Sequence, residues 1–339
     1  MSDAVLDQIV DSLRNSGTEL FPHRSELKTV RVVGHTPKTD HYIYEIVLDF
    51  GDGSERVSAK IYRGGKGGAQ AAHDLAQREL DNLQRISQAC ADHHLDGLPR
   101  AVGDFSSLGA VVCTKINGLP LQSIVMKAAL LPDFGNDGML DQAARNTGEW
   151  LRRFHDATAT DPQPLDGKAL IADIEKLCIR AQKDGLSKDS IESILDYVGT
   201  SLAKLKKPLP SSAVLNDFVP LNVMISDHGI GFSEFANFSS QGNSLQDAAT
   251  FLAAVEALEK YPFCDRSLTS LVQDSFVRAY NVGPQEQQLL TVLKLRVLLQ
   301  MFAQGRAVKE SALRKKVMWA NVMKRFIQTA AERSMAPAA

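Results

Sequence analysis

The chain carries no marked excess of charge of either sign. Its 339 residues include 38 basic and 40 acidic side chains, so the formal charge is only −2. Proteins that bind nucleic acid through its phosphates carry a basic excess, usually gathered on one face. The near balance therefore argues against an electrostatic binder of nucleic acid.

Cysteine is scarce as well. The four cysteines, at positions 90, 113, 178 and 264, are widely scattered and lack the paired spacing of a zinc site or a disulfide framework. Three of them lie in apolar stretches. We expect reduced thiols buried in the interior.

Long hydrophobic runs are missing too. In the first 17 residues, acidic side chains recur every four positions among apolar ones. This spacing predicts an amphipathic helix rather than a signal peptide, which would have a basic and then an apolar segment. The most apolar later segment, Leu289–Phe302, is interrupted by Lys294 and Arg296 and falls short of the roughly 20 residues that span a bilayer. These absences predict a cytoplasmic protein without a membrane segment.

What the sequence does contain is an ordinary globular composition. Hydrophobic residues make up 44% of the chain and charged residues 23%. A chain of 339 residues can bury a full core and would typically divide into two lobes or domains.

The first third of the chain is typical of strands. Apolar residues alternate from Tyr42 to Phe50, and Gly51-Asp52-Gly53-Ser54 is a strong hairpin turn. A helix is expected from about Gln70 to Cys90. The predicted strands form a five-stranded antiparallel sheet with one inserted helix, and they cover Leu27–Gly34, His41–Phe50, Glu55–Arg63, Gly97–Phe105 and Leu108–Ile116.

From Gln142 onward the pattern is mostly helical. A short strand pair around Val223–Ile225 and Ile230–Phe235 is the exception. This predicts an α+β fold of two lobes: a β-rich lobe with an N-terminal helix over residues 1–116, and a helical lobe over residues 117–339. The expected helices cover 142–157, 167–184, 188–205, 244–261, 267–280, 285–304 and 311–333.

The most informative segment lies between the predicted helices, just before that strand pair. In Leu215-Asn216-Asp217-Phe218-Val219-Pro220-Leu221-Asn222, four residues separate an Asp from an Asn. This is the spacing of a phosphotransferase catalytic loop, in which the Asp accepts the proton of the substrate hydroxyl and the Asn holds a magnesium ion. An ordinary turn also uses Asp and Asn, so the neighbouring features matter.

In this order of features the sequence resembles the aminoglycoside phosphotransferase and choline kinase-like branch of the protein-kinase-like fold, over roughly residues 30–255. Lys60, in Val57-Ser58-Ala59-Lys60-Ile61, is similar to the lysine of the third strand that holds the α and β phosphates of the nucleotide. Glu79 matches the helix glutamate that orients this lysine. Taken singly, Lys60 is better explained by a solvent-facing charge and Glu79 by a solvated helix charge, but the match of both residues together favours the resemblance. Strand alternation places Ser58 on the same face as Lys60.

Three further segments extend the resemblance. The run Ala110–Leu121 is similar to the last strand and hinge of the family, where backbone groups hold the adenine. Asp247 resembles the aspartate that braces the backbone of the catalytic loop, although it fits equally well as a charge at a helix N-terminus. His155, after Phe154, is expected to be a packed core residue.

The chain also departs from the family pattern. Leu215 stands where the family usually has a histidine, and Glu234 stands where it has a metal-binding aspartate. Magnesium requires near-ideal octahedral geometry, so the extra methylene of glutamate weighs on the site. The first hairpin, with Gly34 as its one glycine, offers Thr36, Lys38 or Thr39 as a donor to phosphate, and an ordinary surface hairpin fits this segment as well.

The resemblance implies a phosphotransferase that uses ATP or GTP and Mg²⁺ and acts on a hydroxyl of a small polar metabolite or antibiotic-like molecule. Lys60 and Glu79, with Ser58 and Thr36, would bind the nucleotide in the first lobe. Asp217 would align the acceptor in the second lobe, and Asn222 and Glu234 would hold the metal. One alternative is a pseudokinase, a nucleotide-sensing or partner-binding module. A second is transfer of a group to protein acceptors.

The C-terminal segment is rich in basic residues. Its apolar positions, which include Val322 and Phe326, predict one buried helix face, and the basic residues predict a solvated face. The basic residues are Arg306, Lys309, Arg314, Lys315, Lys316, Lys324 and Arg325. The sequence leaves open the acceptor, the choice between ATP and GTP, and the oligomeric state.

Overall fold

The chain divides into two compact units in a computed structural model that describes residues 2–93, 95–131, 137–205, 208–304 and 312–335. The first unit comprises Met1–Gly118 together with Gly231–Phe238. The second comprises Leu119–Ile230 and Ser239–Ala339. Residues 231–238, which the sequence placed in the helical lobe, thus fold with the β-rich part of the chain.

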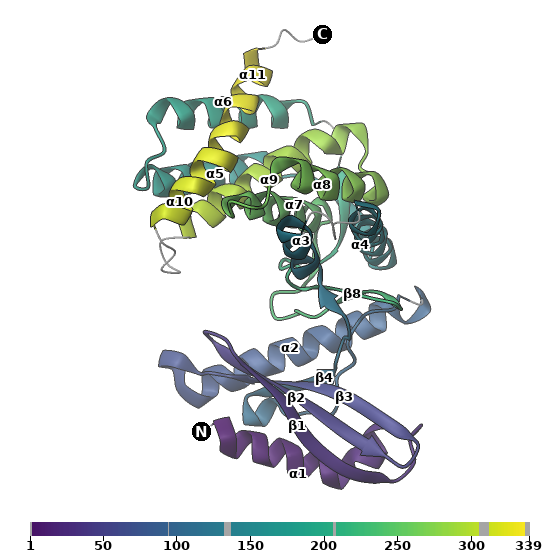
Figure 1. Cartoon of the computed structure of the whole chain (residues 1–339). Helices are drawn as coiled ribbons and strands as arrows, with labels where there is room; N and C mark the ends of the chain where they lie inside the picture. The colour runs from purple at the N-terminus through teal and green to yellow at the C-terminus, as the bar shows by residue number, and fades with distance from the viewer. Residues whose placement is uncertain (1, 94, 132–136, 206–207, 305–311, 336–339) are drawn as a thin grey trace. The chain divides into compact units, whose positions relative to one another are not determined.

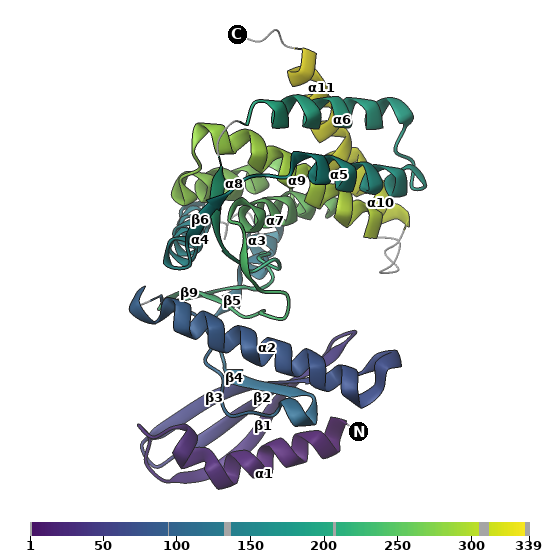
Figure 2. The ribbon, with the colours of Figure 1, turned by 180° about the vertical axis from the view of Figure 1, so that it is seen from behind.

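The first unit is a four-stranded antiparallel sheet between two helices, as Figures 1 and 2 show. The strands follow one another in the order β1-β2-β3-β4. The elements are α1 (Ser2–Leu20), β1 (Leu27–Pro37), β2 (His41–Phe50), β3 (Gly53–Tyr62), α2 (Gly68–Cys90) and β4 (Ala110–Thr114).

The predicted alternation along β2 is confirmed. Tyr44, Ile46, Leu48 and Phe50 are buried in one cluster with residues of α1 such as Leu13. The hydrophobic effect thus fixes which face of the sheet meets α1, because neighbouring residues of a strand point to opposite faces. The side chains of Ile43 and Glu45 point to the other face of the sheet, which they share with Lys60 and Ser58 of β3.

The predicted fifth strand is wrong. In the segment Gly97–Phe105 only Ala101 pairs with β4, through a single bridge to Cys113. Pro99 has no N–H to donate, and Gly103 adopts a left-handed backbone with φ of 72°. A regular strand cannot extend across these two positions.

The first hairpin also differs from expectation. β1 continues to Pro37, which pairs with Tyr42, and the turn is closed by a hydrogen bond from the Lys38 N–H to the His41 carbonyl at 2.9 Å. Thr36 is therefore a strand residue rather than part of a loop. The hairpin turn predicted at Gly51-Asp52-Gly53-Ser54 is present but shorter, with only Gly51 and Asp52 between the strands, because Phe50 pairs with Gly53.

The second unit is mostly helical, as predicted. The sequence missed α3 and a small sheet of order β10-β7-β6. Its helices are α3 (Leu121–Leu130), α4 (Asp137–Ala157), α5 (Gly167–Gln182), α6 (Lys188–Ala203), α7 (Leu245–Glu256), α8 (Arg266–Tyr280), α9 (Pro284–Gln304), α10 (Ala312–Met318) and α11 (Lys324–Met335). The short strands are β5 (Leu119–Pro120), β6 (Thr160–Gln163), β7 (Leu209–Val214), β8 (Val223–Ser226) and β10 (Ser239–Asn243). β9 (Gly229–Phe232) crosses the boundary, because its last two residues belong to the first unit.

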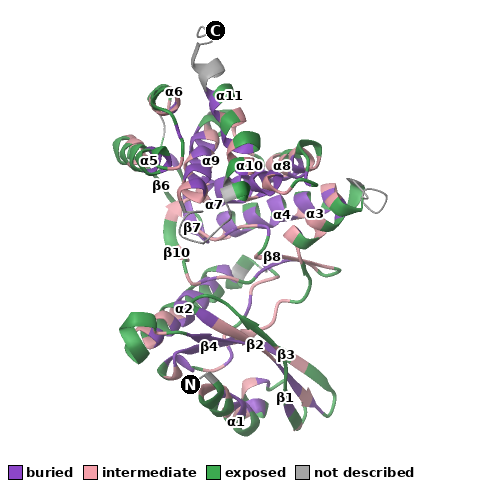
Figure 3. Ribbon diagram, turned by 60° about the vertical axis from the view of Figure 1, so that its left-hand side comes forward, coloured by how far each residue is buried: buried purple, intermediate pink, exposed green. Residues whose placement is uncertain are grey.

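The central element of this unit is α7, which is buried along nearly its whole length (Figure 3). An all-round apolar helix is stable only inside a core. It begins at Leu245 and ends at Glu256, so its two ends present one buried carboxylate each, Asp247 and Glu256. Both carboxylates have partners, described below.

The C-terminal helix is interrupted by a π-helical turn, Trp319–Met323, between α10 and α11. Val322 is buried as predicted, but the expectation of one solvated basic face is wrong for Arg325. Arg325 points inward and pairs with Glu256 and Glu259, because two buried carboxylates attract its guanidinium. Of the other basic residues, Arg306 and Lys309 lie outside the described residues.

The cysteines are free thiols, and three of them are buried as predicted, whereas Cys113 is half-buried. Burial raises the pKa of the Cys113 thiol to about 12 and that of Cys178 and Cys264 to about 11. Within the described residues, no helix is both long and apolar enough to cross a bilayer.

Candidate functional site

Lys60 lies in β3, on the face of the sheet opposite the one that packs against α1. Across the sheet it pairs with Ile43 of β2, which in turn pairs with Thr36 of β1. Directly opposed residues share a face, so Thr36 and Lys60 project on the same side. Lys60 is only 9% exposed, which makes the interpretation as a solvent-facing strand lysine wrong.

The Lys60 ammonium is held by two carboxylates. Its Nζ donates to Glu79 Oε1 at 3.1 Å and to Glu234 Oε1 at 2.7 Å. Glu79 comes from α2, where it is 5% exposed, and Glu234 follows β9. The predicted ion pair between Lys60 and Glu79 is therefore present, and Glu234 joins it.

The cluster extends to two residues that the sequence analysis missed. The Tyr62 hydroxyl donates to Glu79 Oε2, and Lys60 Nζ lies 5.3 Å from the Tyr62 ring centroid. Beside Tyr62 lies His41, whose Nδ1 bonds Asp40 at 2.9 Å and whose Nε2 is buried without a hydrogen-bond partner. Tyr62 could have been found from its position two residues after Lys60, on the same strand face.

Two carboxylates around one ammonium shift the pKa values of the cluster. Burial lowers the pKa of Lys60, but Glu79 and Glu234 outweigh it and leave that pKa above its ordinary value. Burial raises the pKa of Glu79, and the nearby charge of Glu234 adds to this against the opposing effect of Lys60. Lys60 therefore stays charged across the physiological range.

The backbone around Glu234 is fixed by contacts within the first unit. Asn82 of α2 donates to the Phe235 carbonyl at 2.9 Å, and the Phe232 N–H donates to the Gly97 carbonyl at 2.9 Å. At Gly231 a Cβ would lie 2.3 Å from an Ile116 side-chain atom, so only glycine fits there. These contacts place the Glu234 carboxylate beside Lys60.

Ser58 and Thr36, predicted to bind the nucleotide, differ in their surroundings. Ser58 is half-buried on β3 and shares its row of the sheet with Glu45 and Cys113. Thr36 is exposed near the end of β1. Both lie on the Lys60 face, Ser58 on the same strand and Thr36 two strands away.

The segment that contains Asp217 and Asn222 is a compact loop in the second unit. Asn222 Nδ2 donates to the Asp217 carbonyl at 3.0 Å, the Val219 N–H donates to the same carbonyl at 2.8 Å, and the Asn222 N–H donates to the Val219 carbonyl at 2.9 Å. The Asp217 side chain is half-buried. The loop thus holds Asp217 and Asn222 close together along the backbone.

Asp247 supports this loop from the N-terminal end of α7, as the resemblance implied. Its Oδ2 accepts the Leu215 N–H at 2.8 Å, and its Oδ1 accepts the Asn216 N–H at 2.7 Å. Asn216 has a positive φ of 63°, a conformation that asparagine tolerates better than most residues. One buried carboxylate thereby fixes two consecutive amides just before Asp217.

Asp247 is in turn held by His155. His155 Nε2 lies 3.1 Å from Asp247 Oδ2, and its Nδ1 lies 2.8 Å from the Tyr280 hydroxyl. The expectation of a buried His155 is confirmed, since it is 4% exposed. Nothing in the local sequence pointed to Tyr280, which lies 125 positions from His155 along the chain.

The loop is also anchored by packing. Leu215 and Phe218 are fully buried, and the Phe218 ring stacks on Trp150 at 6.0 Å between centroids. Phe218 also contacts Phe251 of α7. Leu215 therefore fills the core where the family has a histidine, but it adds no side-chain hydrogen bond.

The chemistry of the predicted metal ligands fits magnesium. Glu234 and Asn222 offer carboxylate and amide oxygens, the donors that this ion prefers. No group of three or more His, Cys, Asp or Glu side chains in the described part of the chain could hold a metal by itself. Glu234 belongs to the first unit and Asn222 to the second, and magnesium held by one or two protein ligands usually keeps phosphate oxygens and water as its other ligands.

Comparison of the whole chain with solved structures identifies the fold. A glucosamine kinase matches with a TM-score of 0.58 and 15% identity, over 92% of this chain and 96% of that one. A thermostable mutant of an aminoglycoside phosphotransferase, in complex with ADP and hygromycin B, matches with a TM-score of 0.54 and 13% identity, over 96% and 100%. An amicoumacin kinase in complex with AMP-PNP and Ca²⁺ matches with 0.52 and 13%, over 96% of each chain.

No protein-family model and no curated protein sequence matches the chain. Identities this low establish shared architecture. The chain has the two-lobed protein-kinase-like fold of the aminoglycoside phosphotransferases, as its sequence implied.

Proposed function

We propose that this protein is a phosphotransferase that moves the γ-phosphate of ATP or GTP to a hydroxyl of a small polar molecule. The observation that carries the proposal is the buried Lys60, held by Glu79 and Glu234. Burial of a lysine costs free energy unless its charge is paired. Buried clusters of charged side chains are found more often at functional sites than elsewhere. The solved kinases of the same fold bound to ADP or AMP-PNP support this reading.

In this proposal Lys60 binds the α and β phosphates, and Glu79 keeps its ammonium in place. The phosphates compete with Glu234 for Lys60, which releases the Glu234 carboxylate. Ser58 and Thr36 contribute polar groups on the same sheet face. Because phosphoryl transfer passes through a loose transition state, these residues act mainly by position and charge.

The proposed acceptor side belongs to the Asp217 loop. Asp217 orients the attacking hydroxyl and accepts its proton, while Asp247 and Phe218 keep the loop backbone rigid. Asn222 and Glu234 would hold magnesium, which neutralises the charge on the phosphates when it is bound. A glucosamine kinase and a phosphotransferase bound to hygromycin B, both of the same fold, support the proposed acceptor class, a small polar metabolite or an antibiotic-like molecule.

A pseudokinase is the second candidate, and two observations favour it. Glu234 replaces the expected aspartate and accepts a hydrogen bond from Lys60. The buried Leu215 replaces a histidine, which is polar. A misplacement of about 1 Å in a metal ligand costs on the order of 10²-fold in rate. In that case the fold would bind nucleotide or a partner with little turnover.

Nucleotide binding tests the proposal. Calorimetry with ATP and with GTP, with and without Mg²⁺, would be run on the wild type, Lys60→Ala and Glu234→Ala. We expect binding that Mg²⁺ strengthens, a loss of about tenfold or more in affinity in Lys60→Ala, and a loss of the Mg²⁺ effect in Glu234→Ala. Lys66→Ala, at an exposed lysine outside the cluster, is the control.

Turnover separates the two candidates. ATP hydrolysis and transfer to a panel of amino sugars and other polyols would be measured for the wild type and for Glu234→Asp. A faster variant indicates a slowed enzyme, and no turnover in either protein favours the pseudokinase. Absence of nucleotide binding at millimolar concentration would contradict both.

A further inference from the structure

A large cavity in the second unit takes no part in the proposed phosphoryl transfer. Its volume is about 750 Å³, within the range of small-molecule sites, and it is enclosed by α6, α8, α9, α11 and the C-terminal end of α7. The residues that line it include none from the Asp217 loop. That loop is held at the opposite end of α7, by Asp247. The cavity is therefore separate from the loop.

A preformed ionic cluster makes up one wall of the cavity. Glu256, whose side chain is 5% exposed, pairs with Lys294 of α9 and accepts from Arg325 Nη2 of α11 at 3.0 Å. Glu259 accepts from both terminal nitrogens of Arg325, at 2.6 and 3.0 Å. A cation held this firmly pays little entropy when it binds a ligand.

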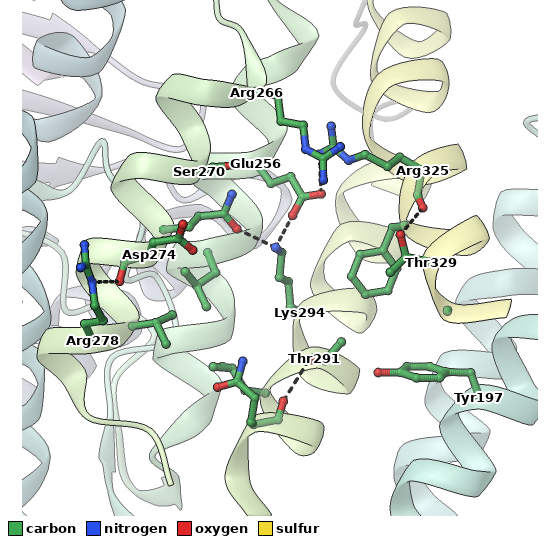
Figure 4. A pocket seen from close by; sticks show the side chains of 17 residues that line it. Tyr197, Glu256, Arg266, Ser270, Asp274, Arg278, Thr291, Lys294, Arg325 and Thr329 are labelled. Carbon is green, nitrogen blue, oxygen red and sulfur yellow. Dashed lines mark hydrogen bonds and ion pairs between the residues drawn. The ribbon is translucent and has the colours of Figure 1, made fainter. Parts of the chain in front are cut away.

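Arg266 is the unbalanced charge of this wall. It is exposed, and its guanidinium has no hydrogen bond or ion pair with any described residue. Figure 4 shows Arg266 and Arg325 extending from α8 and α11 toward the same corner of the cavity, above Glu256. Arg266 also occupies the first position of α8, where the helix dipole disfavours a cation. Two neighbouring guanidinium groups are a favourable site for a phosphate or another anion.

The charge balance of the lining has the same sign. The cations Arg266, Arg278, Lys294 and Arg325 face the carboxylates Glu256 and Asp274, four against two. When Glu259 behind Arg325 and Asp141 beside Arg278 are counted as well, the balance is four against four. Arg266 is then the lining cation that no carboxylate of the described residues pairs, and its charge is left for an anionic ligand.

The rest of the lining is suited to hydroxyl groups. Ser270, Thr291 and Thr329 present hydroxyls, and Gln273 and Gln287 present amides. Ser270 lies one turn from Arg266 on the same face of α8, so a ligand that reaches Arg266 also passes this hydroxyl. Such groups exchange hydrogen bonds with a polyol.

From this combination we propose that the cavity is a second ligand site, which binds a small phosphorylated sugar or polyol. Its phosphate lies between Arg266 and Arg325, and its hydroxyl groups bond to the amides and hydroxyls along α8 and α9. The site does not depend on nucleotide binding at Lys60.

Calorimetry with ribose 5-phosphate in the absence of nucleotide tests the proposal. Ribose and inorganic phosphate are the matched probes for the two halves of the ligand. We expect ribose 5-phosphate to bind more tightly than either, and Arg266→Gln to weaken it about tenfold or more. Arg266→Gln removes no contact within the described residues, so the variant should fold as the wild type does. Arg180→Gln, at an exposed arginine near the end of α5, should bind normally.

Three results would overturn the proposal. They are no binding of ribose 5-phosphate at millimolar concentration, equal affinities for Arg266→Gln and Arg180→Gln, and loss of binding in Lys60→Ala with retention in Arg266→Gln. The last result would place the ligand at the Lys60 cluster. Failure of nucleotide binding would leave the expectation for Arg266 unchanged, so the two proposals fail independently.

Discussion

Lys60 has two carboxylate partners within hydrogen-bonding distance, Glu79 and Glu234. Their combined negative charge exceeds the positive charge of Lys60 and affects the binding of an anionic ligand. The Lys60 ammonium has three N–H donors, of which these carboxylates take two, and an incoming phosphate is repelled by both. Glu234, whose side chain is 23% exposed, is easier to displace than Glu79 at 6%. The same charges keep the pKa of Lys60 above its ordinary value. We therefore expect Lys60 to remain protonated, and able to pair with a phosphate, throughout the neutral range.

His41 gives the first unit a dependence on acid. Burial lowers the pKa of His41, and Lys60 adds to this against the opposite effects of Asp40 and Glu234. A histidine with a lowered folded-state pKa stabilises the fold above its unfolded pKa of about 6.5, and this stability is lost as the pH falls toward the folded value. The melting temperature should therefore fall below about pH 6.5.

Substitution isolates this effect. In His41→Leu the part of the decline that comes from His41 should disappear, whereas His228→Gln, at an exposed histidine, should melt with the wild-type pH profile. Melting curves between pH 5 and 8, chosen to span the histidine pKa of about 6.5, measure this. An unchanged slope in His41→Leu would assign the acid sensitivity to another group.

Among the elements, α7 supports the Asp217 loop. Replacement of Asp247 by Asn leaves an amide facing His155 or one of the two loop N–H groups, so one buried donor loses its acceptor. We expect Asp247→Asn to lower the free energy of unfolding by about 2–3 kcal/mol and to reduce any turnover. Urea unfolding would measure it, with the exposed Asp161→Asn as the control. Equal stabilities would mean that the loop needs no such support.

The sequence predicted helices, strands and the Asp217 loop where a local pattern of residues indicated them. The alternation along β2 and the spacing of Asp217 and Asn222 are local, and both led to regular structure or a compact loop at those residues. Glu234 and Tyr280 meet their partners only after the chain returns over 174 and 125 positions, which no period in the sequence reveals. The segment Gly97–Phe105 failed as a strand because Pro99 and Gly103 override its apolar pattern.

At the scale of the whole molecule, the first unit is discontinuous in sequence. Residues 231–238 supply it with Glu234 and with the Phe232 and Phe235 rings, which pack edge to face at 5.1 Å. Burial of each ring contributes about 1.5–3 kcal/mol, a large part of the stability of a small domain.

A fragment of residues 1–118 should therefore be less stable than the same fragment joined through a short flexible linker to residues 229–240. We expect a difference of about 3–6 kcal/mol in the free energy of unfolding, measured by urea titration. A joined fragment with Phe232→Ser and Phe235→Ser is the control and should resemble residues 1–118 alone. Coinciding midpoints for the joined fragment and residues 1–118 would show that the segment adds no stability.

The late arrival of residues 231–238 also has a consequence for synthesis. A ribosome that adds about 5–20 residues per second needs on the order of 5–20 s to make residues 119–230, which separate the two parts of the first unit. During that interval the nascent first unit contains Lys60 and Glu79 but lacks residues 231–238, and it remains incomplete while attached to the ribosome. Translation speed across residues 119–230, rather than the stability of the finished protein, then sets how long an incomplete lobe is exposed to chaperones and to aggregation.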